Sequence, residues 1–212
     1  MKITKFTHSC LLAETPETSV LFDPGDWSWQ SGSFDINKIA RIDYIVVTHE
    51  HADHFYPEFV QTVLKKFPAA QIVANDRVTH VMQEAGIKAT FTGIETDQIK
   101  PFESPHEELP IPGLPPPEAT GFHFADTLTH PGDCYSFAES KDILALPVIA
   151  PWGATGDAIK VALNLKPKHI IPIHDWHHSP EGRKWLYGLL DSVFSKESIT
   201  FHAVQDGVPI EI

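Results

Sequence analysis

The chain has 212 residues, of which 42% are hydrophobic and 21% charged, a composition typical of a globular protein that can bury a sizeable core. Its formal net charge of -12 disfavours non-specific binding to nucleic acid or to anionic membranes, because both need clustered lysine and arginine. Two isolated cysteines do not make a secreted disulfide framework and no apolar stretch is long enough to cross a bilayer, so by elimination we expect one cytoplasmic domain over residues 1–212.

Short runs of β-prone residues dominate the first third of the chain. They predict strands at Lys2–Phe6, Cys10–Ala13, Ser19–Phe22 and Tyr44–Thr48. Asp23-Pro24-Gly25 closes the third strand with turn-forming residues. Residues 26–38 carry several aromatic side chains and are predicted to form a loop, which supplies either a pocket wall or a subunit contact in a homo-oligomer.

Helices alternate with strands in the middle of the chain. We predict helices at Pro57–Phe67 and from Asn75 or Asp76 to about Ala85, and strands at Gln71–Ala74 and Gln98–Phe102. The proline-rich segment 101–117 can be neither a helix nor a central strand. Because long irregular loops in compact domains are commonly functional, we expect this one to line or cover a site rather than to be a plain linker.

The last third of the chain again interleaves the two kinds of element. Predicted strands are Gly121–Phe124, Thr127–Thr129, Ile143–Ile149, His169–Ile173 and Ile199–Val204, and predicted helices are Gly156–Leu165 and Glu181–Phe194. Strands and helices that alternate through both halves of a chain indicate an α/β architecture.

The hexapeptide His49-Glu50-His51-Ala52-Asp53-His54 directly follows an apolar strand and is the most informative motif. Imidazole is the commonest protein ligand for metals, and imidazoles with a carboxylate suit Zn²⁺, Mn²⁺ or Fe²⁺. In extended backbone, residues two apart point to the same side, so His49 and His51 can converge on one ion. A histidine-rich surface turn is the alternative, but ligand-type residues clustered at a strand end favour a metal site.

Three more segments place a ligand-type residue in a loop or at a strand end. They are Pro105-His106-Glu107, His130-Pro131-Gly132-Asp133 and Ile171-Pro172-Ile173-His174-Asp175. Ligands of a metal site usually come from loops at one rim of a rigid sheet, so these segments are expected to meet the hexapeptide.

The set of motifs resembles that of the metallo-β-lactamase fold superfamily. Its signature His-x-His-x-Asp-His is matched by His49, His51, Asp53 and His54, and Asp23, Asp133 and His174 resemble its other motif residues. Thr7-His8-Ser9-Cys10-Leu11 and Gly132-Asp133-Cys134 are similar to the branch that contains ascorbate-6-phosphate lactonase-like proteins. The resemblance implies a four-layer αββα sandwich with two metal ions at one edge.

Carried over by position, the resemblance assigns His49, His51 and His106 to the first metal and Asp53, His54 and His174 to the second, with Asp133 bridging them. His130 is an alternative third-motif ligand. We prefer His106, because His130 and Asp133 share a short turn and a metal site draws its ligands from separate loops.

We therefore predict a binuclear metal-dependent hydrolase in which a metal-bound hydroxide attacks a small, anionic metabolite, either a lactone or a phosphoester. The ions are expected to be Zn²⁺, with Mn²⁺ or Fe²⁺ as alternatives. Asp53 would orient the attacking oxygen, and His8 or His130 would deliver a proton to the leaving group. Asp23 and Asp175 are candidates for fixing the histidine tautomers. Lys166, Lys168, Arg183 and Lys184 either attract the anionic substrate or form an ordinary solvated surface.

Two other functions remain open from the sequence. A metal-dependent nuclease would keep the metals, but it usually carries an extra domain for gripping the strand, and the negative charge makes nucleic acid an unfavourable partner. A non-catalytic protein would hold metal for structure, sensing or redox chemistry.

Overall fold

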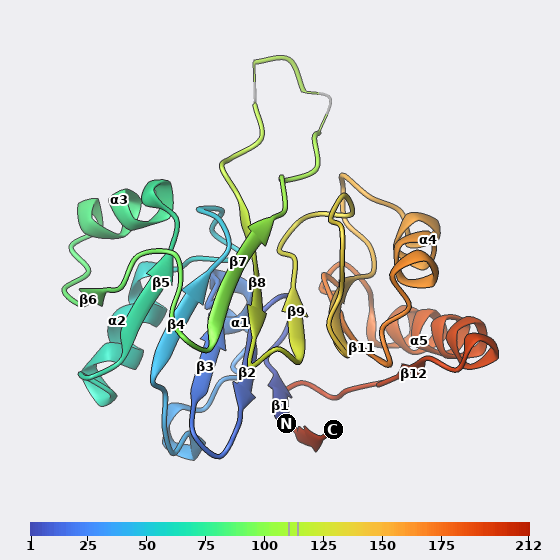
Figure 1. Cartoon of the computed structure of the whole chain (residues 1–212), viewed down its shortest axis with the longest axis horizontal. Helices are drawn as coiled ribbons and strands as arrows, with labels where there is room; N and C mark the ends of the chain where they lie inside the picture. Colours follow the sequence, from blue (N-terminus) through green and yellow to red (C-terminus); the bar gives the residue numbers. More distant parts are fainter. Residues whose placement is uncertain (110, 114) are drawn as a thin grey trace.

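The computed structural model describes residues 1–109, 111–113 and 115–212. Two β-sheets lie face to face, and the longer helices cover their outer faces (Figure 1). The predicted α/β class and the four-layer αββα sandwich are thereby confirmed.

The first sheet is formed mainly by the N-terminal half of the chain. Its strand order is β13 (Pro209–Glu211), β1 (Lys2–Lys5), β2 (Leu11–Glu14), β3 (Ser19–Phe22), β4 (Tyr44–Val47), β5 (Gln71–Ala74) and β6 (Thr90–Phe91). The strands from β13 to β3 are antiparallel to their neighbours, and those from β3 to β6 are parallel. The C-terminal strand β13 was not predicted, since its apolar pattern is too short to stand out from a loop.

The second sheet follows in the chain. Its strand order is β12 (Thr200–Phe201), β11 (His169–Ile173), β10 (Ile143–Pro147), β9 (Leu128–His130), β8 (Thr120–Phe124) and β7 (Ile99–Glu103). Strands β9 to β12 are parallel, whereas β8 is antiparallel to both of its neighbours.

Alternating side chains create three hydrophobic layers. In β4, Val46 faces the second sheet, whereas Ile45 and Val47 face the opposite way, onto α2 (Pro57–Lys66) and α3 (Asp76–Glu84). In β10, Ala145 faces the first sheet, and its neighbours on either side face α4 (Thr155–Leu165) and α5 (Pro180–Phe194). Strands apolar on both faces are thus buried from both sides, as expected where helices cover the sheets.

Residues 26–38 differ from the predicted loop. They form helix α1 (Asp26–Gln30) and a 3₁₀ helix (Ile36–Lys38), and α1 is tied to the metal-binding motif because the Asp26 amide donates to the Ala52 carbonyl at 2.8 Å. Trp29 and Phe34 pack on Phe59 in the core, so most of the aromatic cluster stabilises the fold. A helix of five residues is too short to show a helical repeat of apolar residues in the sequence.

Among the described residues, we find no helix with the length and apolarity needed to cross a membrane.

Candidate metal centre

The predicted ligand segments meet at one edge of the sandwich. Strands β1, β3 and β4 run in the same direction in the first sheet, and β7, β9 and β11 do so in the second. Each of these strands is followed within a few residues by a turn that carries a histidine or an aspartate of the centre. The pairing of the strands thus gathers residues that lie far apart in the sequence.

A first group of ligand-type side chains contains His49, His51, His106 and Asp133. One ligand atom from each lies within 4.8 Å of the others. His106 Nε2 is 3.4 Å and His49 Nε2 is 3.9 Å from Asp133 Oδ2. Only His51 is exposed to solvent, so the group is open on that side.

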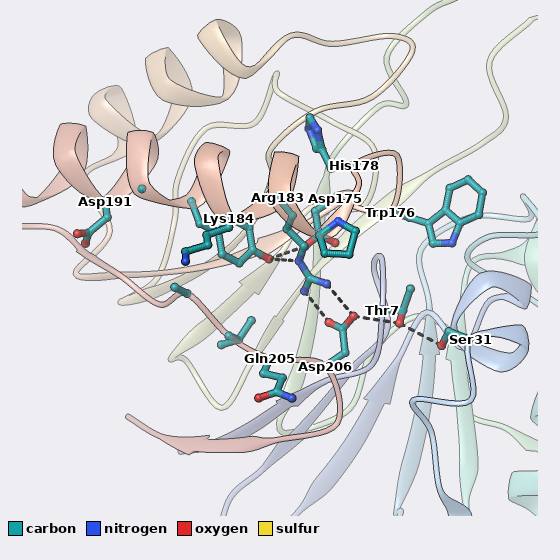
Figure 2. Close-up of a pocket in the computed structure, with 15 residues that line it drawn as sticks. Thr7, Ser31, Asp175, Trp176, His178, Arg183, Lys184, Asp191, Gln205 and Asp206 are labelled. Carbon is teal, nitrogen blue, oxygen red and sulfur yellow. Dashed lines mark hydrogen bonds and ion pairs between the residues drawn. The ribbon is translucent and has the colours of Figure 1, made fainter.

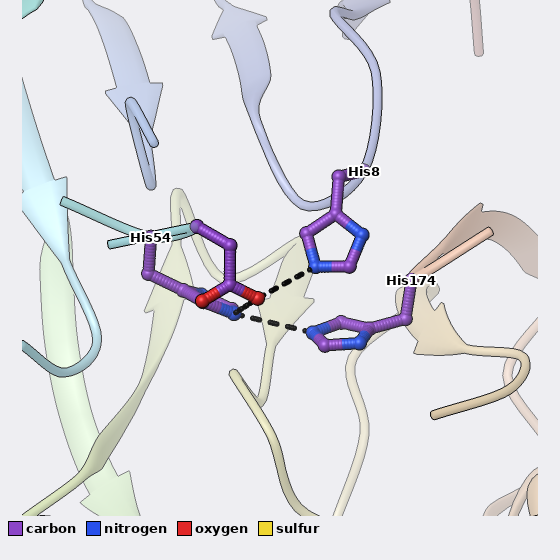
Figure 3. Close-up of side chains that lie close together, drawn as sticks. His8, His54 and His174 are labelled. Atoms are coloured by element: carbon purple, nitrogen blue, oxygen red, sulfur yellow. Dashed lines mark hydrogen bonds and ion pairs between the residues drawn. The ribbon is translucent and has the colours of Figure 1, made fainter. Parts of the chain in front are cut away.

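A second group contains His8, Asp53, His54 and His174, again with ligand atoms within 4.8 Å of one another. His8 Nε2 lies 3.0 Å from Asp53 Oδ2, and His54 Nε2 lies 3.2 Å from His174 Nε2 (Figure 3). The inclusion of His8 is new, since the sequence indicated a substrate-facing or proton-transfer role for it rather than a place among the ligands.

The carboxylate of Asp133 lies between the two groups. Its Oδ1 is 2.6 Å from His174 Nε2 and 2.9 Å from His54 Nε2, whereas its Oδ2 faces His49 and His106. A carboxylate with one oxygen toward each group is placed as a bridging ligand would be.

The unsatisfied atoms at this edge fit a pair of divalent cations. Among the described residues, His49 Nε2 and His106 Nε2 are buried without a hydrogen-bond partner, and both belong to the first group. Buried polar atoms without a partner are costly, and imidazoles with a carboxylate are typical zinc ligands. The donor set therefore fits metal ions of the class that the sequence predicts.

Hydrogen bonds behind the ligands fix their orientation. Asp23 is fully buried and accepts from His54 Nδ1 at 2.7 Å and from the Thr48 hydroxyl at 2.8 Å. His106 Nδ1 donates to the Glu107 carbonyl at 2.6 Å. These contacts leave the Nε2 atoms of His54 and His106 turned toward the site, which is the arrangement that a metal-binding histidine requires.

Burial lowers the pKa of three of these imidazoles. Desolvation and the nearby His174 lower the pKa of His8 to about 3, although its contact with Asp53 acts in the opposite direction. Desolvation likewise lowers the pKa of His49 and of His51. His54 is the exception: burial alone would lower its pKa, but the carboxylates of Asp133, Asp23 and Asp53 raise it well above its ordinary value. Neutral imidazole is the form that binds metal.

Several turns at the site hold strained backbone. His8 and His174 have φ values of 59° and 61°, and Asp23 has a φ of 45°. The left-handed region is unfavourable for residues with a Cβ and persists where surrounding contacts determine the conformation, commonly at functional sites.

Two sequence-based assignments receive no support from the geometry. His130 lies outside both groups: its Nδ1 accepts from the Gly132 amide at 3.3 Å and its Nε2 donates to the Ser9 carbonyl at 3.1 Å. Both of its nitrogens are engaged by backbone, whereas His106 belongs to the first group; His106 as the third-motif ligand stays a prediction. Asp175 fixes no histidine; it pairs with Lys5 and Arg183 instead.

Two of the four predicted cationic residues are engaged in ion pairs. Arg183 is held in ion pairs with Asp175 and Asp206, and Lys168 pairs with Asp142. The attraction of an anionic substrate by the four cationic side chains stays a prediction.

Tryptophans form the rim of the site and were largely missed from the sequence. The Trp152 indole donates to Asp133 Oδ2 at 3.0 Å. Trp27 packs edge-on against His8 with ring centroids 4.4 Å apart, and it stacks on Trp176 at a similar 4.4 Å. Trp176 is 50% exposed, an unusual state for so large an apolar side chain. Its position two residues after the predicted ligand His174 could have indicated from the sequence that Trp176 lies near the site.

Known proteins are similar to this chain in sequence. Residues 2–174 match the family model described as the Beta-lactamase superfamily domain. Protein Rv0786c of Mycobacterium tuberculosis is 31% identical over 200 residues, covering 90% of this chain and 91% of its own length. A UPF0173 metal-dependent hydrolase of Carboxydothermus hydrogenoformans is 30% identical over 195 residues, covering 82% of this chain and 84% of its own.

Solved structures agree at the level of the fold. The metallo hydrolase Igni18 from Ignicoccus hospitalis superimposes with a TM-score of 0.71 at 17% identity, over 100% of this chain and 98% of its own. The extensive match to the family model and the coverage of relatives at 30% identity or more establish the relationship. This chain belongs to the metallo-β-lactamase superfamily and is related to its UPF0173 metal-dependent hydrolases.

Proposed function

We propose that the protein is a binuclear metal-dependent hydrolase of a small metabolite, acting on a lactone or a phosphoester. The observation that carries the proposal is the placement of Asp133 between two groups of ligand-type side chains, of which the first offers three further ligands and the second four. The names of the related UPF0173 proteins agree with metal-dependent hydrolysis.

When bound, a pair of divalent cations lowers the pKa of water toward neutrality and polarises the oxygen of the scissile group. The ligand set suits Zn²⁺, and Mn²⁺ or Fe²⁺ are the alternatives. His49, His51 and His106 would hold one ion, His8, His54 and His174 the other, with Asp133 shared and Asp53 at the second.

Asp53 is the carboxylate best placed to meet the attacking water. Its side chain is 20% exposed, in contrast to the nearly buried Asp133, and Oδ2 is held by His8 at 3.0 Å. His8 is neutral at pH 7, so its role is to orient Asp53 and to offer a lone pair rather than to act as the proton donor that the sequence suggested.

The substrate would approach from the side of His51, Trp176 and Trp152. The exposed imidazole marks the open face of the ligands, and the indoles border it. Because Arg183 and Lys168 are engaged in ion pairs, an anionic substrate would be attracted mainly by the ions themselves. The net charge of -12 disfavours a nucleic acid strand, which favours a small molecule.

Metal-reconstituted protein assayed on a panel of lactones, phosphodiesters, thioesters and single-stranded RNA tests the proposal. We expect hydrolysis of a lactone or a phosphoester that disappears on chelation and returns with Zn²⁺ or Mn²⁺. Asp133→Ala should lose bound metal and activity together, whereas His178→Ala, outside both groups, should keep its metal. Cleavage of RNA alone would favour the nuclease, and full metal content in Asp133→Ala would refute the bridging role.

A further inference from the structure

A buried ionic network lies directly behind the second group of ligands. The Lys5 ammonium, from β1, donates to both carboxylate oxygens of Asp175 at 2.7 and 2.8 Å and to Asp206 at 3.2 Å. Arg183, from α5, binds Asp206 through two nitrogens at 2.7 and 2.9 Å and lies 2.7 Å from Asp175 (Figure 2). Tyr187 adds a hydrogen bond to Asp175. The network contains two cations and two anions, so its charge balances.

This network contributes little net free energy to folding, because its charges must be removed from water. The Lys5 side chain is completely buried and that of Asp175 is 1% exposed. The free-energy cost of removing the charges from water offsets most of the attraction between them. Apolar residues of similar size would often stabilise the core to an equal or greater extent. A conformational role explains its geometry better than a contribution to stability does.

The network is joined to two ligand-bearing turns. Asp175 directly follows His174, and Thr7 directly precedes His8. The Thr7 hydroxyl donates to Asp206 Oδ2 at 3.2 Å, on the same carboxylate that Arg183 and Lys5 bind. Thr7, His8 and His174 all have positive φ, so both turns adopt conformations that need external contacts to hold them.

The first group of ligands is oriented by other contacts. His106 is held by the Glu107 carbonyl, and His49 Nδ1 lies 3.0 Å from the Thr48 hydroxyl, which in turn donates to Asp23. The network behind Asp175 thus joins turns of the second group, whereas Asp23 supports both groups, because it also accepts from His54 of the second group.

We propose that Lys5, Asp206 and Thr7 are positioning residues of the second metal site. Lys5 fixes the turn of His174 through Asp175, and Asp206 fixes the turn of His8 through Thr7. The proposal rests on the two-metal site of the proposed function. Contacts behind the ligands of metal sites typically change metal affinity by about 10- to 100-fold when they are removed. Here the loss should fall on one ion only.

Competition between metal-free protein and a chromophoric chelator for Zn²⁺ gives the two dissociation constants separately. In Asp206→Asn and in Thr7→Val, which nearly preserve side-chain shape, one constant should rise about 10-fold or more while the other stays unchanged. Lys2→Met is the matched control, since Lys2 lies on the same strand and pairs with Glu14 at the surface. It should leave both constants as in the wild type.

A second measurement assigns the affected site. In His106→Ala protein the first group is incomplete, so the ion that remains reports on the second group, and Asp206→Asn should weaken it. Circular dichroism of each metal-free variant confirms folding. Unchanged constants in both variants, or equal losses at both sites, would overturn the positioning role. A wild-type protein that binds no ion would instead contradict the proposed function.

Discussion

The carboxylate of Asp23 accepts hydrogen bonds from His54 Nδ1 at 2.7 Å and from the Thr48 amide at 2.8 Å while being entirely shielded from solvent. One acidic side chain thereby joins the end of β3 to the start of the metal-binding motif after β4. Several measurable consequences arise from contacts of this kind.

Replacing Asp23 by asparagine should weaken metal binding. In Asp23→Asn the side chain loses its charge, and one of its two oxygens is replaced by an amide group that cannot accept a hydrogen bond. Because His54 then loses the contact that orients it, we expect Zn²⁺ affinity to fall about 10- to 100-fold. Competition with a chromophoric chelator measures the Zn²⁺ affinity. Asp43→Asn is the control, because Asp43 accepts the Ser19 amide at 2.8 Å at the opposite ends of β3 and β4. Equal affinities in wild type and Asp23→Asn would disprove the orienting role.

A methyl group at Gly25 should disrupt the motif mechanically. A Cβ built there would lie 1.8 Å from the Asp53 carbonyl oxygen, which is backbone and cannot rotate away. Gly25→Ala should therefore lower the free energy of unfolding by about 3 kcal/mol. Gly188→Ala, in α5 with open space around it, should raise it by about 0.5–1 kcal/mol. Urea denaturation of the metal-free proteins measures the free energy of unfolding of each variant. A Gly25→Ala variant as stable as wild type would contradict the close contact.

Removing the exposed indole at the rim should affect substrate binding alone. Because Trp176 stacks on Trp27 beside His8, Trp176→Ala should raise KM about tenfold, the equivalent of roughly 1.4 kcal/mol of aromatic contact, with bound metal unchanged. Trp185→Ala, 70% exposed on α5, serves as the control and should leave KM unaltered. Steady-state kinetics together with elemental analysis separates the two effects. A fall in metal content with unchanged KM would place Trp176 among the structural supports instead.

Asp206 should make stability depend on pH in the acid range. Burial alone would raise the pKa of this carboxyl, but hydrogen bonds and charges from Arg183 and Lys5 lower it from 3.8 to about 2. A depressed folded-state pKa gives stability that is complete above pH 3.8 and is lost as the pH falls through about 2. At pH 7, Asp206→Asn should cost about 2 kcal/mol, and the difference from wild type should shrink below pH 4.

Denaturant titrations of wild type and Asp206→Asn between pH 7 and pH 2.5 follow this difference. Asp191→Asn, on the adjoining helix, is the comparison variant and should show no such convergence. A gap between wild type and Asp206→Asn that stays constant down to pH 2.5 would argue against an ionised Asp206 in the network.

The identity of the metal-binding segments could be predicted from local sequence. Tyr44–Val47 forms the predicted buried strand, and the histidines and aspartate after it enter both ligand groups. The predicted helices start at recognisable signals: Pro57 opens α2, and the Asn75 side chain caps α3 by accepting from the Val78 amide at 2.8 Å. These features depend on neighbouring residues alone, so the chain specifies them without reference to its fold.

The choice between His106 and His130 needed the tertiary structure. His106 follows β7 and His130 ends β9, and the sequence offered only the short turn shared by His130 and Asp133 as a reason to prefer His106. The stacking of His130 on Phe22, with ring centroids 5.2 Å apart, and its contact with Ser9 turn it away from the ligands. Those partners belong to the first sheet, so the packing of one sheet on the other decided the assignment.

What the sequence by itself determined is the order of the longer strands and helices, the composition of each ligand-bearing turn and the family. What only the tertiary structure decided is which turns support one another: Lys5 meets Asp175 across 170 residues and Asp206 across 201. The physical reason is that spacing and propensity act over one or two turns of chain, whereas a buried charge can be satisfied only by a partner that the packed sheets and α5 bring to it.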